Sequence, residues 1–448
     1  MVMPGYRGNV QKLLKKASVK VGDKIRVESR KRTYIGVLMP RTELGDLNHL
    51  VLKLNSGYNV GVRVNGTTKV TLLESGKLPE LSVPKPEMVQ DLTKPKVTII
   101  GTGGTIASRV DYRTGAVYPA FTPEDIYSAV PEIAEIANIK VVEACNVFSE
   151  HMTPDLWVKI ARVVAKEING GATGVVVAHG TDTMGYTAAA LSFMLQGLFR
   201  PVVLVGSQRS SDRPSSDAAL NLISAVTVAA RSDIAEVTVV MHGSTDDDFC
   251  LIHRGTKVRK CHTSRRDAFQ SINDIPLGMV RDAQVKMLRD DYNRASPSGR
   301  VKTRGRFEKK VALVKVTPGI PSSVIRGIVA SGDRGIVLEG TGLGHVPESL
   351  FDGIELARKR KLPVVMTSQC IWGRIDMNVY STGRDLLKLG VIPGGDMLPE
   401  VAWVKLMWVL GRTKDPKNVA KLMLQNLAGE ITPRTRPDVF LKPIFTLE

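Results

Sequence analysis

Residues 97–108 read VTIIGTGGTIAS, and this stretch decides the fold. Its first four residues are apolar or β-branched, a pattern typical of a strand buried on both faces of a parallel sheet. The run ends in a Gly-Gly turn that displays Thr105. Because ligands of open parallel sheets bind beyond the carboxyl ends of the strands, the stretch predicts an α/β fold with a site at this turn.

Similar strand–turn–helix units follow along the chain. Continuous apolar runs read GVVVAHGT (174–181), PVVLVGSQ (201–208) and AEVTVVMHGS (235–244). Amphipathic stretches alternate with them, such as DLWVKIARVVAKEIN (155–169) and DAALNLISAVTVAARS (217–232), and these predict helices. This alternation predicts mainly parallel sheets that are covered by helices on both faces.

Changes of pattern divide the chain into five parts. Residues 1–80 hold five short, partly alternating apolar runs separated by turn residues, which predict a small basic SH3-like β-barrel. Residues 81–95 are proline-rich and without periodicity, as in a linker. We then expect a larger α/β domain over 96–296, a basic linker over 297–310 and a smaller α/β domain over 311–448.

The net charge of +18 is unevenly distributed. Residues 1–72 contain fourteen Lys or Arg against four Asp or Glu. This asymmetry favours a polyanionic partner, and RNA is the obvious candidate, although no zinc-finger or RNP aromatic signature supports it. A second basic strip, residues 254–266, could face RNA or a protein partner, or could be a solvated loop.

The composition excludes several classes of protein. No run of about 18 apolar residues predicts a membrane-spanning helix, and the basic N-terminus lacks the apolar core of a signal peptide. The four cysteines form no CxxC pair, so we expect free thiols in a reducing cytosol and no metal site. The sequence therefore predicts a cytoplasmic globular protein.

Hydroxyl-bearing turns follow three of the predicted strands. Thr105 lies in the first turn, Thr181 and Asp182 lie in AHGTDTMG (178–185), and Ser149 and Glu150 lie in NVFSEHM (146–152). Any one of these threonines is more typical of a turn or a helix N-cap. Three such turns at the end of one sheet favour an active site over a purely structural role.

The glycine turn could also bind a dinucleotide or a phosphate. Gly101 and Gly103 fit the first positions of the G-x-G-x-x-G/A fingerprint, but Ile106 occupies the last, and no G-K-[ST] follows for a P-loop. The glycines are better explained by backbone N–H groups that approach a small ligand.

A threonine hydroxyl is a weak nucleophile unless a neighbouring base takes its proton. Asp182 and Lys260 could supply this base, because a desolvated lysine held by an aspartate can accept the proton of Thr181. Backbone N–H groups of the glycine turn would hold the oxyanion of an attacked carbonyl. The pattern predicts acyl transfer.

Two sequence motifs resemble those of a known enzyme family with this chemistry. TGGTIAS (102–108) and HGTDTM (179–184) resemble the two signatures of the asparaginase-type amidohydrolases, in the right order. The stretch LVGSQRSSDRPSSDAALNL (204–222) is similar to the sequence that follows the second signature in that family. The resemblance covers roughly residues 95–445 and implies an asparaginase-like core of two α/β domains.

The resemblance also implies roles for single residues. Thr105 matches the nucleophile, although Thr181 also sits beside a plausible base, and Tyr112 resembles the tyrosine of the loop that closes over it, with Tyr118 as the alternative. The implied catalytic set is Thr105, Tyr112, Thr181, Asp182 and Lys260, the last matched through VRKCHTSRRDAFQSIN (258–273). The implied substrate-binding set is Gly104, Ser149, Glu150, Gly180 and Asp182, with Ser149 and Glu150 at the α-carboxylate and α-amine.

A basic barrel in front of an asparaginase-like core resembles the D-subunit family of the archaeal glutamyl-tRNA(Gln) amidotransferases. That resemblance implies ammonia release from glutamine or asparagine by this chain, which would bind no cofactor. An E subunit would use ATP and Mg²⁺ and pass the ammonia to glutamate on tRNA(Gln). It also implies a homodimer within a D2E2 assembly. The alternatives are a free-standing cytosolic L-asparaginase and a nucleic-acid-binding protein with an inactive site.

Overall fold

The computed structural model describes residues 6–29, 32–39, 41, 46–54, 59–76, 91, 93–103, 108–110, 117–119, 130–209 and 216–440. The chain forms two compact units, each described separately below. The N-terminal unit comprises Met1–Pro86 and Ser108–Ala120. The main unit comprises Glu87–Ala107 and Phe121–Glu448.

The N-terminal unit contains the five strands that the sequence predicts, arranged as one antiparallel sheet. The strands are β1 (Lys24–Ser29), β2 (Arg32–Leu38), β3 (His49–Leu54), β4 (Asn59–Arg63) and β5 (Lys69–Glu74), in the order β4-β3-β2-β1-β5. Ser29 Oγ donates to Arg63 O at 2.9 Å, which links the ends of β1 and β4. A short hairpin of β7 (Ser108–Val110) and β8 (Val117–Pro119) belongs to the same unit.

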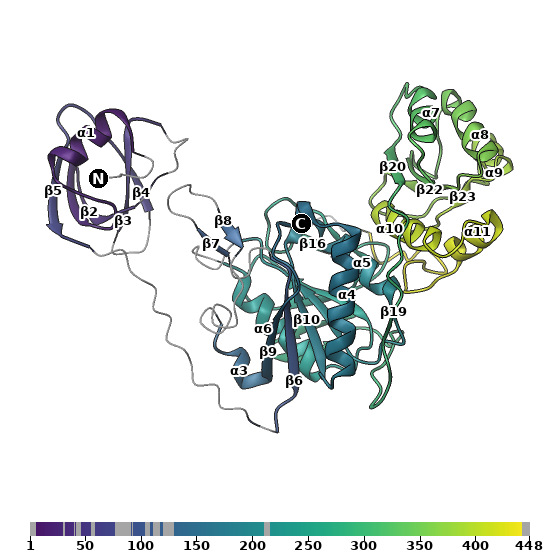
Figure 1. The fold of residues 1–448 in the computed structure, drawn as a ribbon, viewed down its shortest axis with the longest axis horizontal. Coiled ribbons are helices and arrows are strands. Elements are labelled where there is room, and N and C mark those ends of the chain that lie inside the picture. The colour runs from purple at the N-terminus through teal and green to yellow at the C-terminus, as the bar shows by residue number, and fades with distance from the viewer. Residues whose placement is uncertain are drawn as a thin grey trace, which may run out of the picture. The chain divides into compact units, whose positions relative to one another are not determined.

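Helix α1 (Gly8–Lys16) covers this sheet, as Figure 1 shows, and it was not predicted from the sequence. Val10 and Leu14 lie one turn apart on its buried face. They join Ile25, Leu50 and Leu52 in the core of the unit. The remaining helix surface is basic, which hid the short apolar stripe in the sequence.

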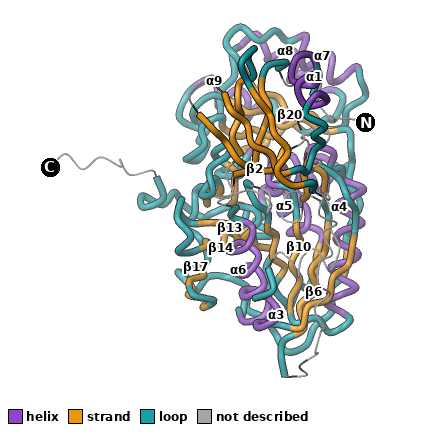
Figure 2. The backbone as a smooth tube through the Cα atoms, turned by 90° about the vertical axis from the view of Figure 1, so that its left-hand side faces the viewer, coloured by secondary structure: helices purple, strands orange, loops and turns teal. Residues whose placement is uncertain are grey.

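An eight-stranded sheet forms the centre of the larger α/β domain. Its order is β18-β17-β14-β13-β12-β10-β6-β9. The parallel strands are β6 (Lys96–Gly101), β9 (Asn138–Glu143), β10 (Gly174–Ala178), β12 (Val202–Val205) and β13 (Val237–His242). The antiparallel strands β14 (Cys250–Arg254), β17 (Gly278–Arg281) and β18 (Gln284–Met287) extend it, and Figure 2 shows β13, β14 and β17 beyond β10 and β6.

Helices cover both faces of this sheet, as the apolar strands require. Helices α4 (Pro154–Asn169) and α5 (Met184–Met194) pack on the face of Val175 and Val177. Helices α3 (Ile133–Ile136) and α6 (Ala218–Arg231) pack on the face of Val176 and Ala178. Figure 1 shows the two pairs on opposite sides of β6 and β10.

The smaller α/β domain has a four-stranded parallel sheet, in the order β20-β21-β22-β23. Its strands are β20 (Val311–Lys315), β21 (Gly335–Gly340), β22 (Val364–Ser368) and β23 (Ile392–Pro393). Its helices are α7 (Ser323–Ala330), α8 (Phe351–Lys359), α9 (Ser381–Lys388), α10 (Pro399–Leu410) and α11 (Pro416–Leu424).

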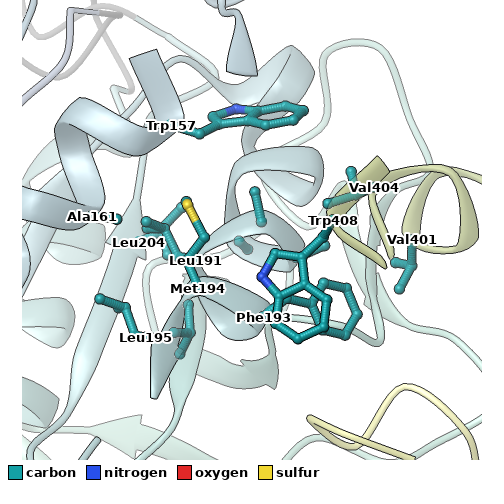
Figure 3. Close-up of a cluster of buried hydrophobic side chains, with 14 of the residues drawn as sticks. Trp157, Ala161, Leu191, Phe193, Met194, Leu195, Leu204, Val401, Val404 and Trp408 are labelled. Carbon is teal, nitrogen blue, oxygen red and sulfur yellow. The ribbon is translucent and has the colours of Figure 1, made fainter. Parts of the chain in front are cut away.

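Helix α10 joins the two domains into one core. It is buried almost all round, and its Val401, Val404 and Trp408 lie in the same apolar cluster as Trp157 and Phe193 of the larger domain (Figure 3). The Phe193 and Trp408 rings are 5.9 Å apart, within the range of favourable aromatic contacts. The two α/β domains are therefore packed against each other, without a solvated hinge at this contact.

Shorter elements complete the main unit. They are the pairs β11 (Leu195–Gln196) with β19 (Lys302–Thr303) and β15 (Val258–Lys260) with β16 (Phe269–Ser271), and the 3-10 turns η1 (Ser149–His151), η2 (Thr181–Thr183) and η3 (Glu348–Leu350). The stretch 297–310, expected as a linker, thus contains β19. The four cysteines are free thiols. In the described part of the chain, no helix is both long enough and apolar enough to span a bilayer.

Candidate active site

Lys260, Thr181 and Asp182 meet beyond the carboxyl end of β10. The Lys260 Nζ donates to Thr181 Oγ1 at 2.9 Å and to Asp182 Oδ1 at 2.6 Å. Thr181 and Asp182 lie on η2, directly after β10, and Lys260 ends β15. The side chains of Lys260 and Asp182 are 14% and 69% exposed. The lysine amine is thus largely covered and hydrogen-bonded to a hydroxyl, while the carboxylate beside it faces solvent.

The Ser149 turn packs against the same place. Thr183 Oγ1 donates to Ser149 O at 2.7 Å, which ties η2 to η1. A Cβ on Gly180 would lie 2.8 Å from the Ser149 Cβ, so only glycine allows this approach. Ser149 is buried, and Glu150 next to it is exposed. The structure thus brings Ser149, Gly180 and the Lys260 group together, with Glu150 on the adjoining turn.

The glycine turn after β6 reaches the same edge of the sheet. Thr102 Oγ1 donates to Ala178 O, the last residue of β10, at 2.9 Å. Gly103 has a φ of +101°, and a Cβ there would lie 2.3 Å from Val147 O. Backbone of this shape favours glycine. Gly104, Thr105 and Tyr112 lie outside the described residues, so the structure does not test their predicted positions.

A buried chain of hydrogen bonds supports the turn that carries Thr181. The Trp157 Nε1 donates to Thr187 Oγ1 at 3.0 Å, and Thr187 Oγ1 lies 2.9 Å from His179 Nε2. His179 Nδ1 lies 2.7 Å from Gly180 O. Because a carbonyl only accepts, Nδ1 must carry a proton, and in the neutral ring Nε2 then accepts from the Thr187 hydroxyl.

Burial favours the neutral form of His179. Burial lowers the pKa of this imidazole from 6.5 to about 4, and the hydrogen bond to Gly180 O opposes that shift. His179 lies in the second sequence motif, but the sequence analysis assigned it no role. The contributions of Trp157 and Thr187 to the site were not predicted. Their side chains come from α4 and α5, and no local pattern marks them as partners of the turn.

The basic strip 254–266 differs in part from what the sequence predicts. Its six Lys and Arg side chains are all paired with carboxylates of the same chain: Arg254 with Glu236, Lys257 with Asp396, Arg259 with Glu400, Lys260 with Asp182, Arg265 with Asp267 and Arg266 with Asp247. Arg254 and Lys257 are also buried. The start of the strip is therefore not a basic surface, whereas residues 261–265 form an exposed loop next to Lys260, as the solvated-loop alternative predicts.

The described residues contain no group of three or more His, Cys, Asp or Glu side chains placed to hold a metal ion. The site presents an amine, a carboxylate, hydroxyls and backbone groups instead. Such groups can bind a small zwitterion and move protons between hydroxyls and a carbonyl substrate.

Comparison with known proteins identifies the family to which the chain belongs. Residues 96–293 match the family "Asparaginase, N-terminal", residues 310–423 match "Glutaminase/Asparaginase C-terminal domain", and residues 19–73 match "GatD N-terminal domain". The D subunit of the glutamyl-tRNA(Gln) amidotransferase of Pyrococcus horikoshii is 56% identical over 97% of this chain and 100% of that protein. The chain belongs to this family of D subunits. The Methanothermobacter thermautotrophicus member is 52% identical over 96% of this chain and 98% of its own length.

The core is also similar to solved structures. The thermostable L-asparaginase of Thermococcus kodakarensis is 36% identical, with a TM-score of 0.68, and the match covers 76% of this chain and all of that one. These findings confirm the expected asparaginase-like core of two α/β domains. The D-subunit relatives cover nearly the whole chain, so they account for the N-terminal unit as well as for the core.

The buried, neutral His179 predicts a loss of stability in mild acid. Unfolded His179 takes up a proton below about pH 6.5, whereas the folded residue resists protonation until about pH 4. The free energy of unfolding should therefore fall with decreasing pH in this window, by up to about 3 kcal/mol from this residue. His179→Asn keeps a donor near the Nδ1 position and removes the titration.

Urea unfolding at a series of pH values between 7.5 and 4.5 measures this effect. The stability difference between the native chain and His179→Asn should shrink as the pH falls. A difference that stays constant across the window would show that His179 is not held neutral.

Proposed function

We propose that this chain is the ammonia-releasing subunit of a tRNA-dependent amidotransferase, acting on the side-chain amide of glutamine or asparagine. The observation that carries the proposal is the Lys260 amine, which is held between Thr181 Oγ1 and Asp182 Oδ1 beyond the carboxyl end of β10. Membership of the D-subunit family and the asparaginase-like core support the same chemistry.

The reaction is acyl transfer in two halves. A threonine hydroxyl, which we assign to Thr105, attacks the amide carbon, the C–N bond breaks, and ammonia leaves with the transferred proton. Water then attacks the acyl-threonine ester and releases the acid. The Thr105 proton leaves on the ammonia. In the second half, the attacking water passes its proton through Thr181 to the Lys260 amine over their 2.9 Å contact, and this proton returns to the Thr105 oxygen as the ester bond breaks, while Asp182 holds the amine in place.

Substrate recognition follows from the neighbouring turns. Ser149, Glu150 and Asp182 would bind the α-carboxylate and α-amine, with Gly104 and Gly180 leaving room for the substrate backbone. Backbone N–H groups of the glycine turn would stabilise the oxyanion. Tyr112 would close over Thr105. This division of roles rests on the motifs, supported by the packing of Ser149 on Gly180.

The released ammonia would be consumed at a second active site, on a partner subunit. Free ammonia at neutral pH is mostly ammonium, which is not a nucleophile, so a transferase must shield it between sites. We infer an E subunit that uses ATP and Mg²⁺ to activate glutamate on tRNA(Gln), in a cytoplasmic D2E2 assembly built on a homodimer of this chain. This chain itself would bind no cofactor.

The N-terminal unit offers a surface for the nucleic acid. We assign it an SH3-like barrel, supported by the five-stranded sheet and by the Ser29 bond to Arg63 between β1 and β4. A groove of about 850 Å³ in this unit is lined by Ser29, Arg32, Tyr34, Asn48, Gly61, Val62, Arg63, Val64 and Asn65. Arg32 and Arg63 are exposed and have no ion pair within the described residues. Guanidinium groups and a tyrosine ring suit phosphates and bases.

Dependence on tRNA separates this function from that of a free-standing asparaginase. Ammonia release from glutamine and asparagine would be measured with the purified chain alone and then with the partner subunit and glutamyl-tRNA(Gln). We expect little release alone and strong release in the full mixture. Fast hydrolysis of asparagine that is unmoved by tRNA would support the asparaginase instead.

Removal of the Lys260 amine should nearly abolish amide hydrolysis. Lys260→Ala is expected to lower kcat by about 10³-fold, the size of a general acid–base contribution, while the chain stays folded. Lys309→Ala is the matched control, because it removes an exposed lysine that is paired with Asp155 at 2.6 Å and has no proposed role. Near-normal turnover of Lys260→Ala would overturn the proposed proton transfer.

Reversal of the groove charges should weaken tRNA binding. The double variant Arg32→Glu/Arg63→Glu is expected to lower tRNA affinity and the steepness of its salt dependence, since each lost phosphate contact reduces both. Lys12→Glu/Lys16→Glu on α1 changes the net charge equally outside the groove. Equal losses in the two variants would indicate unspecific attraction, and no loss in either would remove this unit from tRNA binding.

A further inference from the structure

Lys260 lies on a hairpin that is not part of the eight-stranded sheet. Strands β15 and β16 pair only with each other, through Val258 with Ser271 and Lys260 with Phe269, and they form a separate two-stranded hairpin. Two residues of β15 separate Lys260 from Lys257. A hairpin of this size is marginal alone, so its position depends on its contacts. Val258 and Phe269 pack in the main apolar core, His253 Nδ1 of β14 lies 2.8 Å from Ser271 Oγ, and further polar contacts hold its base.

A buried ion pair holds the start of the hairpin. The Lys257 Nζ lies 2.7 Å from Asp396 Oδ2, and the two side chains are 0% and 2% exposed. Burial lowers the pKa of the Lys257 amine, and Asp396 opposes that shift. Asp396 belongs to the smaller domain, where its Oδ1 also accepts from Thr432 N at 3.0 Å. The carboxylate is therefore fixed from both sides.

An asparagine holds the end of the hairpin to the same domain. The Asn273 Nδ2 donates to Gly373 O at 2.9 Å and to Asp396 O at 3.1 Å. Gly373 N donates in return to Asn273 Oδ1 at 2.7 Å. Both strands of the hairpin are thus attached at their base to the segment 373–396 of the smaller domain.

Two further contacts lie in β15 and just before it. Thr256 Oγ1 donates to Ala428 O at 2.9 Å, and Arg259 Nε lies 3.6 Å from Glu400 Oε1. Ala428 and Glu400 again belong to the smaller domain. Every one of these polar contacts places the larger domain's hairpin against the smaller domain, which itself supplies no residue of the Lys260–Thr181–Asp182 group in this chain.

We propose that Lys257 and Asp396 are positioning residues for the reaction, which hold the hairpin so that the Lys260 amine reaches Thr181. This proposal rests on the proposed function, because the reaction that Lys260 serves is the proposed release of ammonia. A buried ion pair rarely adds much stability, because desolvation offsets the attraction, but it is satisfied in only one geometry. Lys257 and Asp396 therefore select one placement of β15, and the smaller domain becomes part of the catalytic machinery through contact.

The test compares two neutralised carboxylates. Asp396→Asn removes the charge opposite Lys257, whereas Glu167→Gln removes the charge opposite Lys140, an ion pair of the same 2.7 Å length at a partly buried site away from the hairpin. Both full-length variants would be assayed for ammonia release with the partner subunit and glutamyl-tRNA(Gln). For Asp396→Asn we expect kcat to fall by about 10²-fold, as for a displaced catalytic group, with KM nearly unchanged. Glu167→Gln should keep the native kcat.

Hydrogen exchange of the hairpin gives a readout that does not depend on activity. Amides of Val258–Lys260 and Phe269–Ser271 should exchange faster in Asp396→Asn than in the native chain, and not in Glu167→Gln. If the native protein released no ammonia, the proposed function would fail, yet this exchange would still test the positioning.

The double variant Lys257→Met/Asp396→Asn guards against simple loss of folding. It removes both charges of the buried Lys257–Asp396 pair, and among the other described cations only the partly exposed Arg374 loses its contact with Asp396. Its thermal stability should therefore recover relative to Asp396→Asn, while kcat stays low. Recovery of kcat together with stability would overturn the proposal, because Lys257 and Asp396 would then act only on folding. So would unchanged kcat in a folded Asp396→Asn, or equal losses in Glu167→Gln.

Discussion

The contact between the Lys260 amine, the Thr181 hydroxyl and the Asp182 carboxylate is the constraint on which the rest of the site depends. Lys260 and Thr181 are 79 positions apart in the chain and 2.9 Å apart in space. A contact of this kind tolerates little displacement, since hydrogen bonds weaken steeply when distance or angle changes. Each side of the contact must therefore be held firmly by its own surroundings.

The two sides are held by different means. The Thr181 turn rests on the chain of hydrogen bonds from Trp157 through Thr187 to His179, in which every donor has an acceptor. The Lys260 hairpin packs in the main apolar core and is attached at its base to the smaller domain. Trp157 also contacts Trp403 of α10 edge-on at 6.2 Å, so the apolar packing between the domains lies directly beneath the first support.

Most of the described site residues could be predicted from the sequence, but the ion pairing of the basic strip and helix α1 could not. The residues Thr181, Asp182, Lys260, Ser149 and Gly180 were all chosen from motifs, and the structure brings them together. Arg254 and Lys257 of the basic strip 254–266 are buried and cannot face a partner, and a count of charges missed this because their carboxylate partners come from distant segments. Helix α1 was missed because two buried residues, Val10 and Leu14, are its only fully buried positions.

The fold class was readable from the sequence for a simple reason. A strand covered by helices on both faces must be apolar throughout, and β10 and β13 are buried at every position, so the run of residues itself reveals the layer. The pairing of Lys257 with Asp396, 139 positions later, has no such signature. Only the packing of α10 between the domains brings these charges together, because the partner of a buried charge is chosen by proximity in space and not by any local pattern of residues.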